Sequence, residues 1–141
     1  MKRRKRYERS TLRIETYFQQ LQETIAACRV LQASNVTYDK RGTHEGFLRG
    51  ELYFVDGSVL HFREAVDTEL IIDRLMYTYQ YMTATKALVF RYDNTGHHKR
   101  LNLPTYPHHK HDGSEENVTA SSAPVLLAVL REVESLVQLS P

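Results

Sequence analysis

Residues 47–66 read FLRGELYFVDGSVLHFREAV, and this stretch decides the fold. Asp56-Gly57 in its middle is a strong signal for a two-residue hairpin turn, because such turns need backbone with positive φ. The flanking segments, 47–55 and 58–66, are rich in aromatic and β-branched residues, which favour strands. We therefore predict an antiparallel β-hairpin at the centre of the chain.

Further strands are predicted on both sides of this hairpin. Residues 35–40, 74–82 and 87–92 alternate aromatic or aliphatic side chains with polar ones, which is typical of a strand with one buried face. Residues 68–73 fit either a helix or a strand and are left open. Together these segments predict an antiparallel sheet of about five strands.

Two amphipathic helices enclose the sheet in sequence. Residues 11–33 carry Ile14, Phe18, Leu21, Ile25 and Cys28 at helical spacing. Residues 123–138 carry a second apolar stripe, preceded by Ser122 as the expected N-cap. The expected fold class is α+β, with the sheet packed against an N-terminal and a C-terminal helix on one of its faces.

The chain of 141 residues is the length of one domain, which we expect over residues 11–141. Residues 1–10 form a basic tail that we expect to be flexible. Seven of the first 13 residues are basic and one is acidic, so this end is predicted to attract polyanions in a salt-sensitive way. No apolar run predicts a membrane span or a signal peptide, and the single cysteine fits a reducing cytoplasm.

Histidine is concentrated in one polar segment. Five of the seven histidines lie between residues 97 and 111, within the segment 93–121, which lacks apolar periodicity. They are His97, His98, His108, His109 and His111. Long irregular segments in compact domains are usually functional or disordered. We therefore expect the functional site in the loop from Asp93 to His111.

Three kinds of chemistry remain open for this loop. A histidine pair near its ordinary pKa of about 6.5 can move protons in the cleavage of an RNA phosphodiester, with Arg91 or Lys110 stabilising the phosphate charge. Alternatively, His109 and His111 bind a metal together with His97 or Asp93. The third interpretation is a solvated polar loop without a specific site.

A carboxylate, a row of tyrosines and two isolated histidines outside the loop are further candidates for a functional or a structural role. Glu64 shares a predicted face with apolar neighbours, so it needs a partner if it is buried, and Arg91 or a histidine is the expected one. The row Tyr77, Tyr79, Tyr81 either stacks nucleic-acid bases or packs against the core. His44 and His61 are isolated in sequence, and we interpret both as structural.

Several short motifs, taken in order, resemble the TumE-like toxin family. They are Phe54-Val55-Asp56-Gly57-Ser58, Leu60-His61-Phe62-Arg63-Glu64, Tyr77-Thr78-Tyr79-Gln80-Tyr81, Phe90-Arg91-Tyr92-Asp93-Asn94, His97-His98 and Pro107-His108-His109-Lys110-His111. The resemblance covers residues 14–138. It implies a small bacterial or archaeal toxin of a type II toxin–antitoxin pair, neutralised by a separate antitoxin protein that is often a DNA-binding regulator. The residues that match the polar motifs are Glu64, Arg91, Asp93, Asn94, His97, His98, His108, His109 and His111.

The hypothesis from sequence is a cytoplasmic toxin that cleaves RNA without a metal or other cofactor. His109 and His111 are the expected proton-transfer pair, and His97 or His108 replaces either. Arg91 would bind phosphate, while Glu64 and Asp93 would orient a histidine. Asn94, His98 and Lys110 are expected to contact the substrate.

Two alternatives of other classes accompany this hypothesis. In one, the sheet and the loop bind a protein or a nucleic acid without catalysis. In the other, hydrolysis depends on a metal. The expected partners are an antitoxin, RNA and a second copy of the chain that covers an exposed sheet edge.

Overall fold

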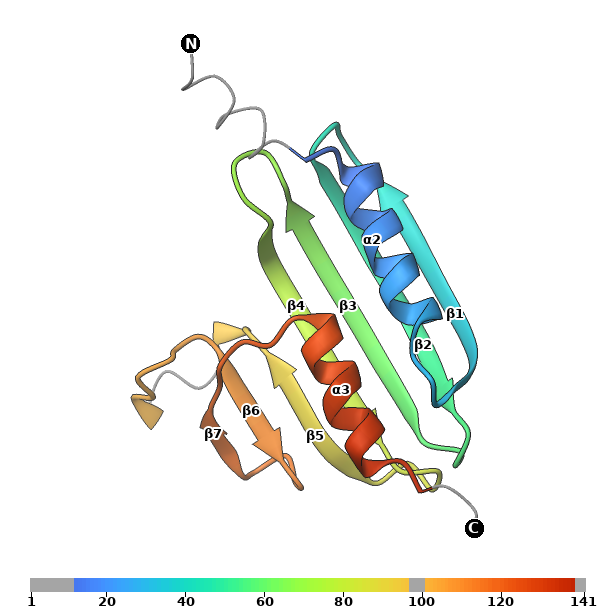
Figure 1. Ribbon diagram of the computed structural model, residues 1–141. Coiled ribbons are helices and arrows are strands. Elements are labelled where there is room, and N and C mark those ends of the chain that lie inside the picture. The colour runs from blue at the N-terminus through green and yellow to red at the C-terminus, as the bar shows by residue number, and fades with distance from the viewer. Residues whose placement is uncertain (1–11, 97–100, 139–141) are drawn as a thin grey trace.

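The computed structural model describes residues 12–96 and 101–138 and has an α+β fold (Figure 1). The elements in chain order are α2 (Ile14–Ala26), β1 (Leu31–Lys40), β2 (Glu45–Phe54), β3 (Val59–Asp67), β4 (Asp73–Met82), β5 (Leu88–Asp93), β6 (His109–Asp112), β7 (Val118–Ala120) and α3 (Leu126–Leu136). The strands form one antiparallel sheet in the order β1 to β7. The predicted fold class is confirmed, but the sheet has seven strands rather than about five.

The two additional strands lie in the segment that was expected to be irregular. β6 pairs with β5, and β7 pairs with β6. They are short, with four and three residues. Their sequences contain almost no large apolar side chains, so apolar periodicity could not reveal them.

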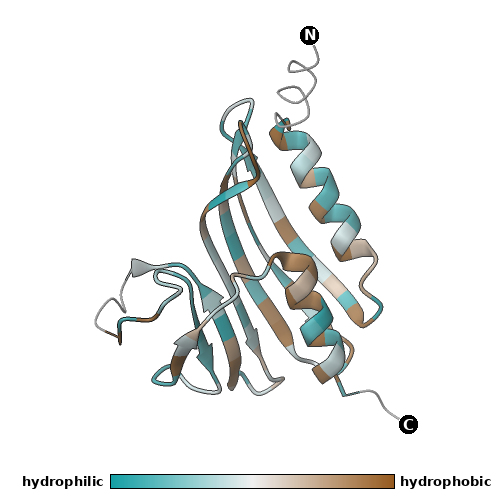
Figure 2. Ribbon diagram, turned by 60° about the vertical axis from the view of Figure 1, so that its left-hand side comes forward, coloured by the Kyte–Doolittle hydropathy of each residue, from teal (hydrophilic) through white to brown (hydrophobic). Residues whose placement is uncertain are grey.

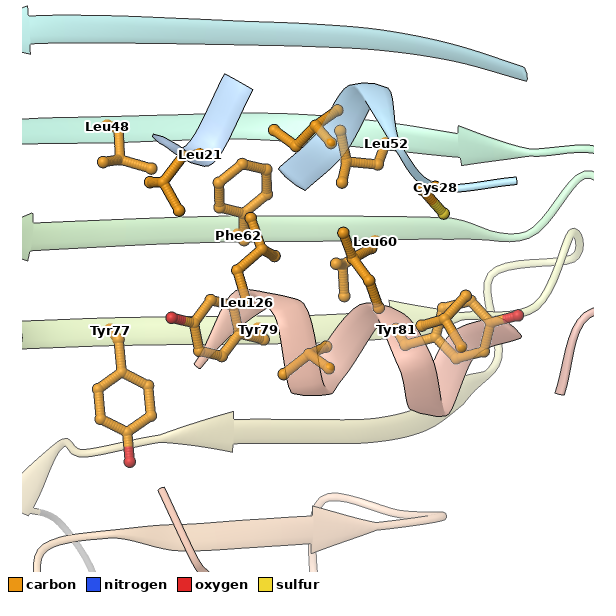
Figure 3. Close-up of a cluster of buried hydrophobic side chains, with 14 of the residues drawn as sticks. Leu21, Cys28, Leu48, Leu52, Leu60, Phe62, Tyr77, Tyr79, Tyr81 and Leu126 are labelled. Atoms are coloured by element: carbon orange, nitrogen blue, oxygen red, sulfur yellow. The ribbon is translucent and has the colours of Figure 1, made fainter. Parts of the chain in front are cut away.

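Both α-helices, α2 and α3, cover the same face of the sheet, and within residues 12–96 and 101–138 no α-helix covers the other face (Figures 1 and 2). Figure 3 shows the apolar side chains of β2, β3 and β4 packed beneath α2 and α3. Gly46 lets α2 approach β2 closely, because a Cβ there would lie 2.6 Å from Phe18 and 2.7 Å from Ile14. Cys28 is buried in this core as predicted, but the expected helix over residues 11–33 is too long: α2 ends at Ala26, and β1 begins at Leu31.

The tyrosine row of β4 belongs to the same core. Tyr77, Tyr79 and Tyr81 are at most 3% exposed. Tyr79 and Tyr81 lie beside α3, whereas Tyr77 lies beyond the end of this helix and contacts His108 and Arg74 (Figure 3). The packing alternative for these residues therefore holds in this structure, and base stacking on this row would need α3, His108 and Arg74 to move away.

The central hairpin differs from the predicted one in its turn. Tyr53 lies opposite Val59, and the Phe54 amide donates to the Ser58 carbonyl oxygen at 3.0 Å. The loop between them therefore has three residues, with Gly57 at φ +87° in its last position. A three-residue loop that ends in a left-handed residue is the next most common hairpin connection after the two-residue one.

The C-terminal helix begins later than predicted. Its N-cap is Val125 rather than Ser122, because Ala123 has φ +55°, which no helix continues. Arg74 holds this segment in place by donating to the carbonyl oxygens of Ala123 and Pro124 at 2.8 and 2.9 Å. The predicted basic tail, residues 1–10, lies outside the described residues. Among the helices that the structure describes, none has the length and apolar composition needed to cross a membrane.

Candidate functional site

The helix-free face of the sheet carries a polar groove. The groove has a volume of about 460 Å³ and crosses β1 to β4. It is lined by Asn35, Arg49, Gly50, Glu51, His61, Phe62, Arg63, Thr78 and Gln80. Strand alternation explains this composition, because residues that alternate with the buried Leu60 and Phe62 must point away from the helices.

Two arginines face each other across the floor of this groove. Arg49 of β2 lies directly opposite Arg63 of β3, and both side chains are exposed. Within the described parts of the chain, no carboxylate lies within ion-pair distance of either one. Like charges directly opposite each other destabilise a strand pair, so the arrangement favours an anion between them.

On the same face, the next cross-strand pair toward the turn combines a carboxylate with an imidazole. Glu51 lies opposite His61, and Glu51 Oε2 is 3.8 Å from His61 Nε2. The other carboxylate oxygen accepts a hydrogen bond from the Tyr53 hydroxyl at 2.6 Å. The two side chains are 38% and 41% exposed, so both can contact a ligand in the groove.

A second polar cluster lies on the same face at β5 and β6, and it is buried. Asp93 lies opposite His109, and Arg91 lies opposite His111. The distances from the Asp93 carboxylate are 2.9 Å to His109 Nε2 and 3.8 Å to His111 Nε2. All three side chains are only 2–4% exposed. The structure therefore unites three residues that the sequence proposed together for a metal or a proton-transfer site.

Backbone carbonyls fix the orientation of both imidazoles. His109 Nδ1 lies 2.9 Å from the Pro107 carbonyl oxygen, and His111 Nδ1 lies 2.8 Å from that of Glu115. A carbonyl oxygen only accepts hydrogen bonds, so each Nδ1 carries the proton. Each Nε2 then faces the carboxylate of Asp93.

Arg91 connects the buried cluster to the groove. Its guanidinium donates to both carboxylate oxygens of Glu115 at 2.6 and 2.8 Å, and to Asp93 Oδ2 at 3.2 Å. A further bond of 2.9 Å reaches Oε1 of Gln80, which lines the groove. The hydrogen bonds from Arg91 lower the pKa of the Glu115 carboxyl. The Arg91 donors are thus used within the protein.

The other predicted residues of this region have local contacts of their own. His108 stacks on Tyr77 with 5.8 Å between ring centroids, and its Nδ1 lies 2.8 Å from the Tyr77 hydroxyl. Asn94 accepts a hydrogen bond from the Tyr77 amide at 3.0 Å. Lys110 lies on the helix-covered face, 3.5 Å from Glu132 of α3. His97 and His98 lie outside the described residues.

Glu64 is buried as alternation predicted, but its expected partners are corrected. It lies on the helix-covered face with no exposed surface, and the hydroxyls of Tyr17 and Tyr79 donate to its two oxygens. Arg91, His109 and His111 lie on the opposite face of the sheet. Burial raises the pKa of the Glu64 carboxyl, since the apolar surroundings disfavour its charged form.

The groove residues were missed in the sequence. His61 is interpreted as structural from the sequence because it is isolated along the chain. Arg49, Glu51 and Arg63 are not among the predicted site residues. The hairpin could have revealed them, but a two-residue turn pairs Glu51 with Phe62 rather than with His61. Only the three-residue loop of the structure brings the four side chains to one face.

The comparison with protein families agrees with the resemblance of the motifs. The family model described as Toxin TumE matches residues 21–137, which include the C-terminal part of α2, all seven described strands and the whole of α3. No curated protein and no solved structure matches the chain. Because the match covers most of the sequence, the chain belongs to the TumE toxin family.

Proposed function

We propose that this toxin cleaves RNA in the groove on the helix-free face of its sheet. The observation that carries the proposal is the arginine pair Arg49 and Arg63 beside the exposed pair Glu51 and His61. A cation pair for a phosphate next to a carboxylate and an imidazole is the set of groups that phosphodiester cleavage by proton transfer requires.

The substrate's phosphate would lie between the two arginines. Neither guanidinium is neutralised by a described carboxylate, so a bound phosphate removes their mutual repulsion and accepts hydrogen bonds from both. Guanidinium groups also stabilise the charge that builds on the phosphate oxygens during the reaction.

Glu51 and His61 would move the protons. The Glu51 carboxylate takes the proton of the ribose 2′-hydroxyl, whose oxygen attacks phosphorus. The bond from phosphorus to the 5′-oxygen breaks, and the protonated His61 imidazole gives its proton to that oxygen. The products are a 2′,3′-cyclic phosphate and a free 5′-hydroxyl, and no metal takes part in the step.

The buried cluster has a supporting role in this proposal. His109 and His111 are 2% and 3% exposed, and both Nδ1 atoms are held by backbone carbonyls, so neither ring reaches the groove in this structure. Arg91 acts as a positioning residue, because its bond to Gln80 fixes one wall of the groove. Direct proton transfer by His109 and His111 stays the prediction from sequence.

The toxin would act in the cytoplasm and be neutralised by a separately encoded antitoxin. The family supports a toxin role and, with it, an antitoxin partner. The single cysteine of the chain suits a reducing compartment. An antitoxin that covers the groove would block access of RNA to Arg49 and Arg63.

The test is cleavage of a labelled single-stranded RNA by purified wild type and the His61→Ala and Glu51→Gln variants. We expect each substitution to lower the rate at least about 100-fold, the usual contribution of general acid–base catalysis. His44→Gln is the control, because the His44 ring is bonded to the Leu12 carbonyl oxygen and does not line the groove. Full activity of both groove variants would refute the proposed pair, and a simultaneous loss in folded His109→Gln would move the chemistry to the buried cluster. Binding without turnover by the wild type would instead identify a non-catalytic module.

A further inference from the structure

We propose that Asp93, His109 and His111 form a structural binding site for a divalent transition metal such as zinc. These side chains can each offer one ligand atom, and the three atoms lie within 4.8 Å of one another. The proposal concerns metal binding and stability, so it goes beyond the proposed cleavage of RNA and does not rest on it.

The first argument is the spacing of the ligand atoms. Two ligands at about 2.0–2.2 Å from a tetrahedral zinc ion lie roughly 3.4 Å apart. The two distances from the Asp93 carboxylate to the imidazole nitrogens are 2.9 and 3.8 Å, on either side of that value. A shift of about half an ångström in either ring would therefore be enough to admit the ion.

The second argument is the orientation of the imidazoles. In protein metal sites, a histidine that binds through one nitrogen almost always donates its other N–H to a carbonyl or a carboxylate. His109 and His111 both do so, since each Nδ1 donates to a backbone carbonyl. With the proton on Nδ1, each Nε2 can offer its lone pair to an ion held between the rings and the Asp93 carboxylate.

The third argument is the support of the carboxylate. Asp93 Oδ1 accepts hydrogen bonds from the Thr95 amide and hydroxyl at 3.1 and 3.0 Å, while Oδ2 accepts one from Arg91. Such bonds around a ligating carboxylate orient it toward a metal. The carboxylates of Asp93 and Glu115 also exceed the single charge of Arg91, which leaves a negative balance among these described groups for a cation to offset.

Burial indicates the role of the ion. All three ligand side chains are 2–4% exposed, so a metal here would be closed to solvent and to RNA. Three protein ligands leave the fourth position of a tetrahedral ion to a trapped water molecule, and because burial keeps substrate away from it, the ion would contribute folding energy. The ion would hold β5 and β6 together at the end where only short strands extend the sheet.

The test is titration of metal-depleted, full-length protein with Co²⁺ and with Zn²⁺. We expect one equivalent of Co²⁺ to give visible absorption of a four-coordinate N/O site, and one equivalent of Zn²⁺ to raise the Tm. On ¹⁵N-labelled wild type, the Nε2 signals of His109 and His111 should shift while both Nδ1 atoms keep their protons. This measurement on the wild type stands even where a ligand variant folds poorly.

Variants locate the site. Asp93→Asn and His111→Gln should lose the Co²⁺ absorption and the Tm increase, and His108→Gln should retain both because His108 is bonded to Tyr77. Absence of stoichiometric binding by the wild type would overturn the proposal. It would also fail if the binding persists in both ligand variants, or if Zn²⁺ shifts only other histidines. RNA cleavage is not measured here, so the outcome is separate from that of the proposed function.

Discussion

The substitution Arg63→Gln tests whether the groove binds RNA through its arginine pair. Arg63 lies directly opposite Arg49, both are exposed, and no described carboxylate pairs with either. Glutamine keeps much of the side-chain length but removes the charge. If the pair serves an anion, the substitution must weaken RNA binding and at the same time relieve a repulsion within the folded protein.

Both effects have expected sizes. One phosphate contact to single-stranded nucleic acid contributes about 0.7 to the slope of log affinity against log salt. Between 50 and 200 mM salt, loss of that contact should make the decrease in affinity about 2.6-fold smaller than for the wild type. Removal of a like charge directly across a strand pair should raise the free energy of unfolding by roughly 0.2–1 kcal/mol.

The assay is fluorescence anisotropy of a labelled 2′-O-methyl RNA, which lacks the free hydroxyl needed for cleavage, at 50 and 200 mM salt. Urea unfolding of the same samples gives the stability. Arg131→Gln is the matched control, because this exposed arginine lies on α3, on the other side of the sheet. An unchanged salt slope in Arg63→Gln would refute the phosphate contact. A clear loss of stability would refute the claim that the arginine pair is unfavourable for the fold.

Two further predictions concern the core that supports the site. Burial raises the pKa of the Glu64 carboxyl, so the folded state binds more protons than the unfolded state. The resulting stabilisation is fully present below the unfolded pKa of about 4.3. It is lost as the pH rises through the folded-state pKa. Urea unfolding should therefore show wild type losing stability relative to Glu64→Gln from pH 4 to 8, and parallel curves would contradict this. Gly46→Ala would place a Cβ 2.6 Å from Phe18, and we expect it to lower the free energy of unfolding by about 1–3 kcal/mol. Gly42→Ala, with its nearest atom at 3.7 Å, is the control in the same urea experiment, and equal stability of the two variants would disprove the close contact.

The sequence predicted most of the sheet because apolar alternation marks strands that have one buried face. It identified β1 to β5 and both helices within a few residues, apart from the longer expected extent of the helices. β6 escaped because His109 and His111, its buried residues, are polar and the strand has only four residues. β6 is a strand because it pairs with β5, which is distant in sequence. A pattern within a short stretch of sequence does not predict such pairing.

The high histidine content of residues 97–111 located the histidine-rich site in the sequence. Its chemistry depends on burial and hydrogen bonds, which the composition does not predict. Asp93, His109 and His111 were proposed together, and they do meet. Their burial and the two carbonyl contacts at Nδ1 come from the path of the chain around β6. For Glu64, alternation gave the correct burial, whereas the tyrosine partner Tyr17 comes from a helix 47 residues away in sequence.

The sequence did not predict the groove because the register of the predicted hairpin differs from the observed register by one residue. Asp56-Gly57 fits a two-residue turn, and that turn would send Glu51 and His61 to opposite faces of the sheet. With Gly57 as the left-handed residue of a three-residue loop, the same side chains become neighbours. A local signal can therefore predict a hairpin correctly and still place every cross-strand pair wrongly.

The groove and the buried cluster of Asp93, His109 and His111 differ in exposure, and this difference indicates different roles. A residue must reach the substrate to exchange a proton with it, and Glu51 and His61 meet this condition in the groove. Asp93 and its two histidines do not, and a buried charge that touches no substrate must be satisfied within the protein. Arg91 and Thr95 already donate to Asp93, and the proposed cation at β6 would offset the negative charge that remains. Arg91 also bonds to Gln80, so it would link this cluster to the groove. Removal of the metal should therefore lower the Tm, and the rate of RNA cleavage should fall only where the protein unfolds. Removal of a catalytic metal would instead lower the cleavage rate of the folded protein.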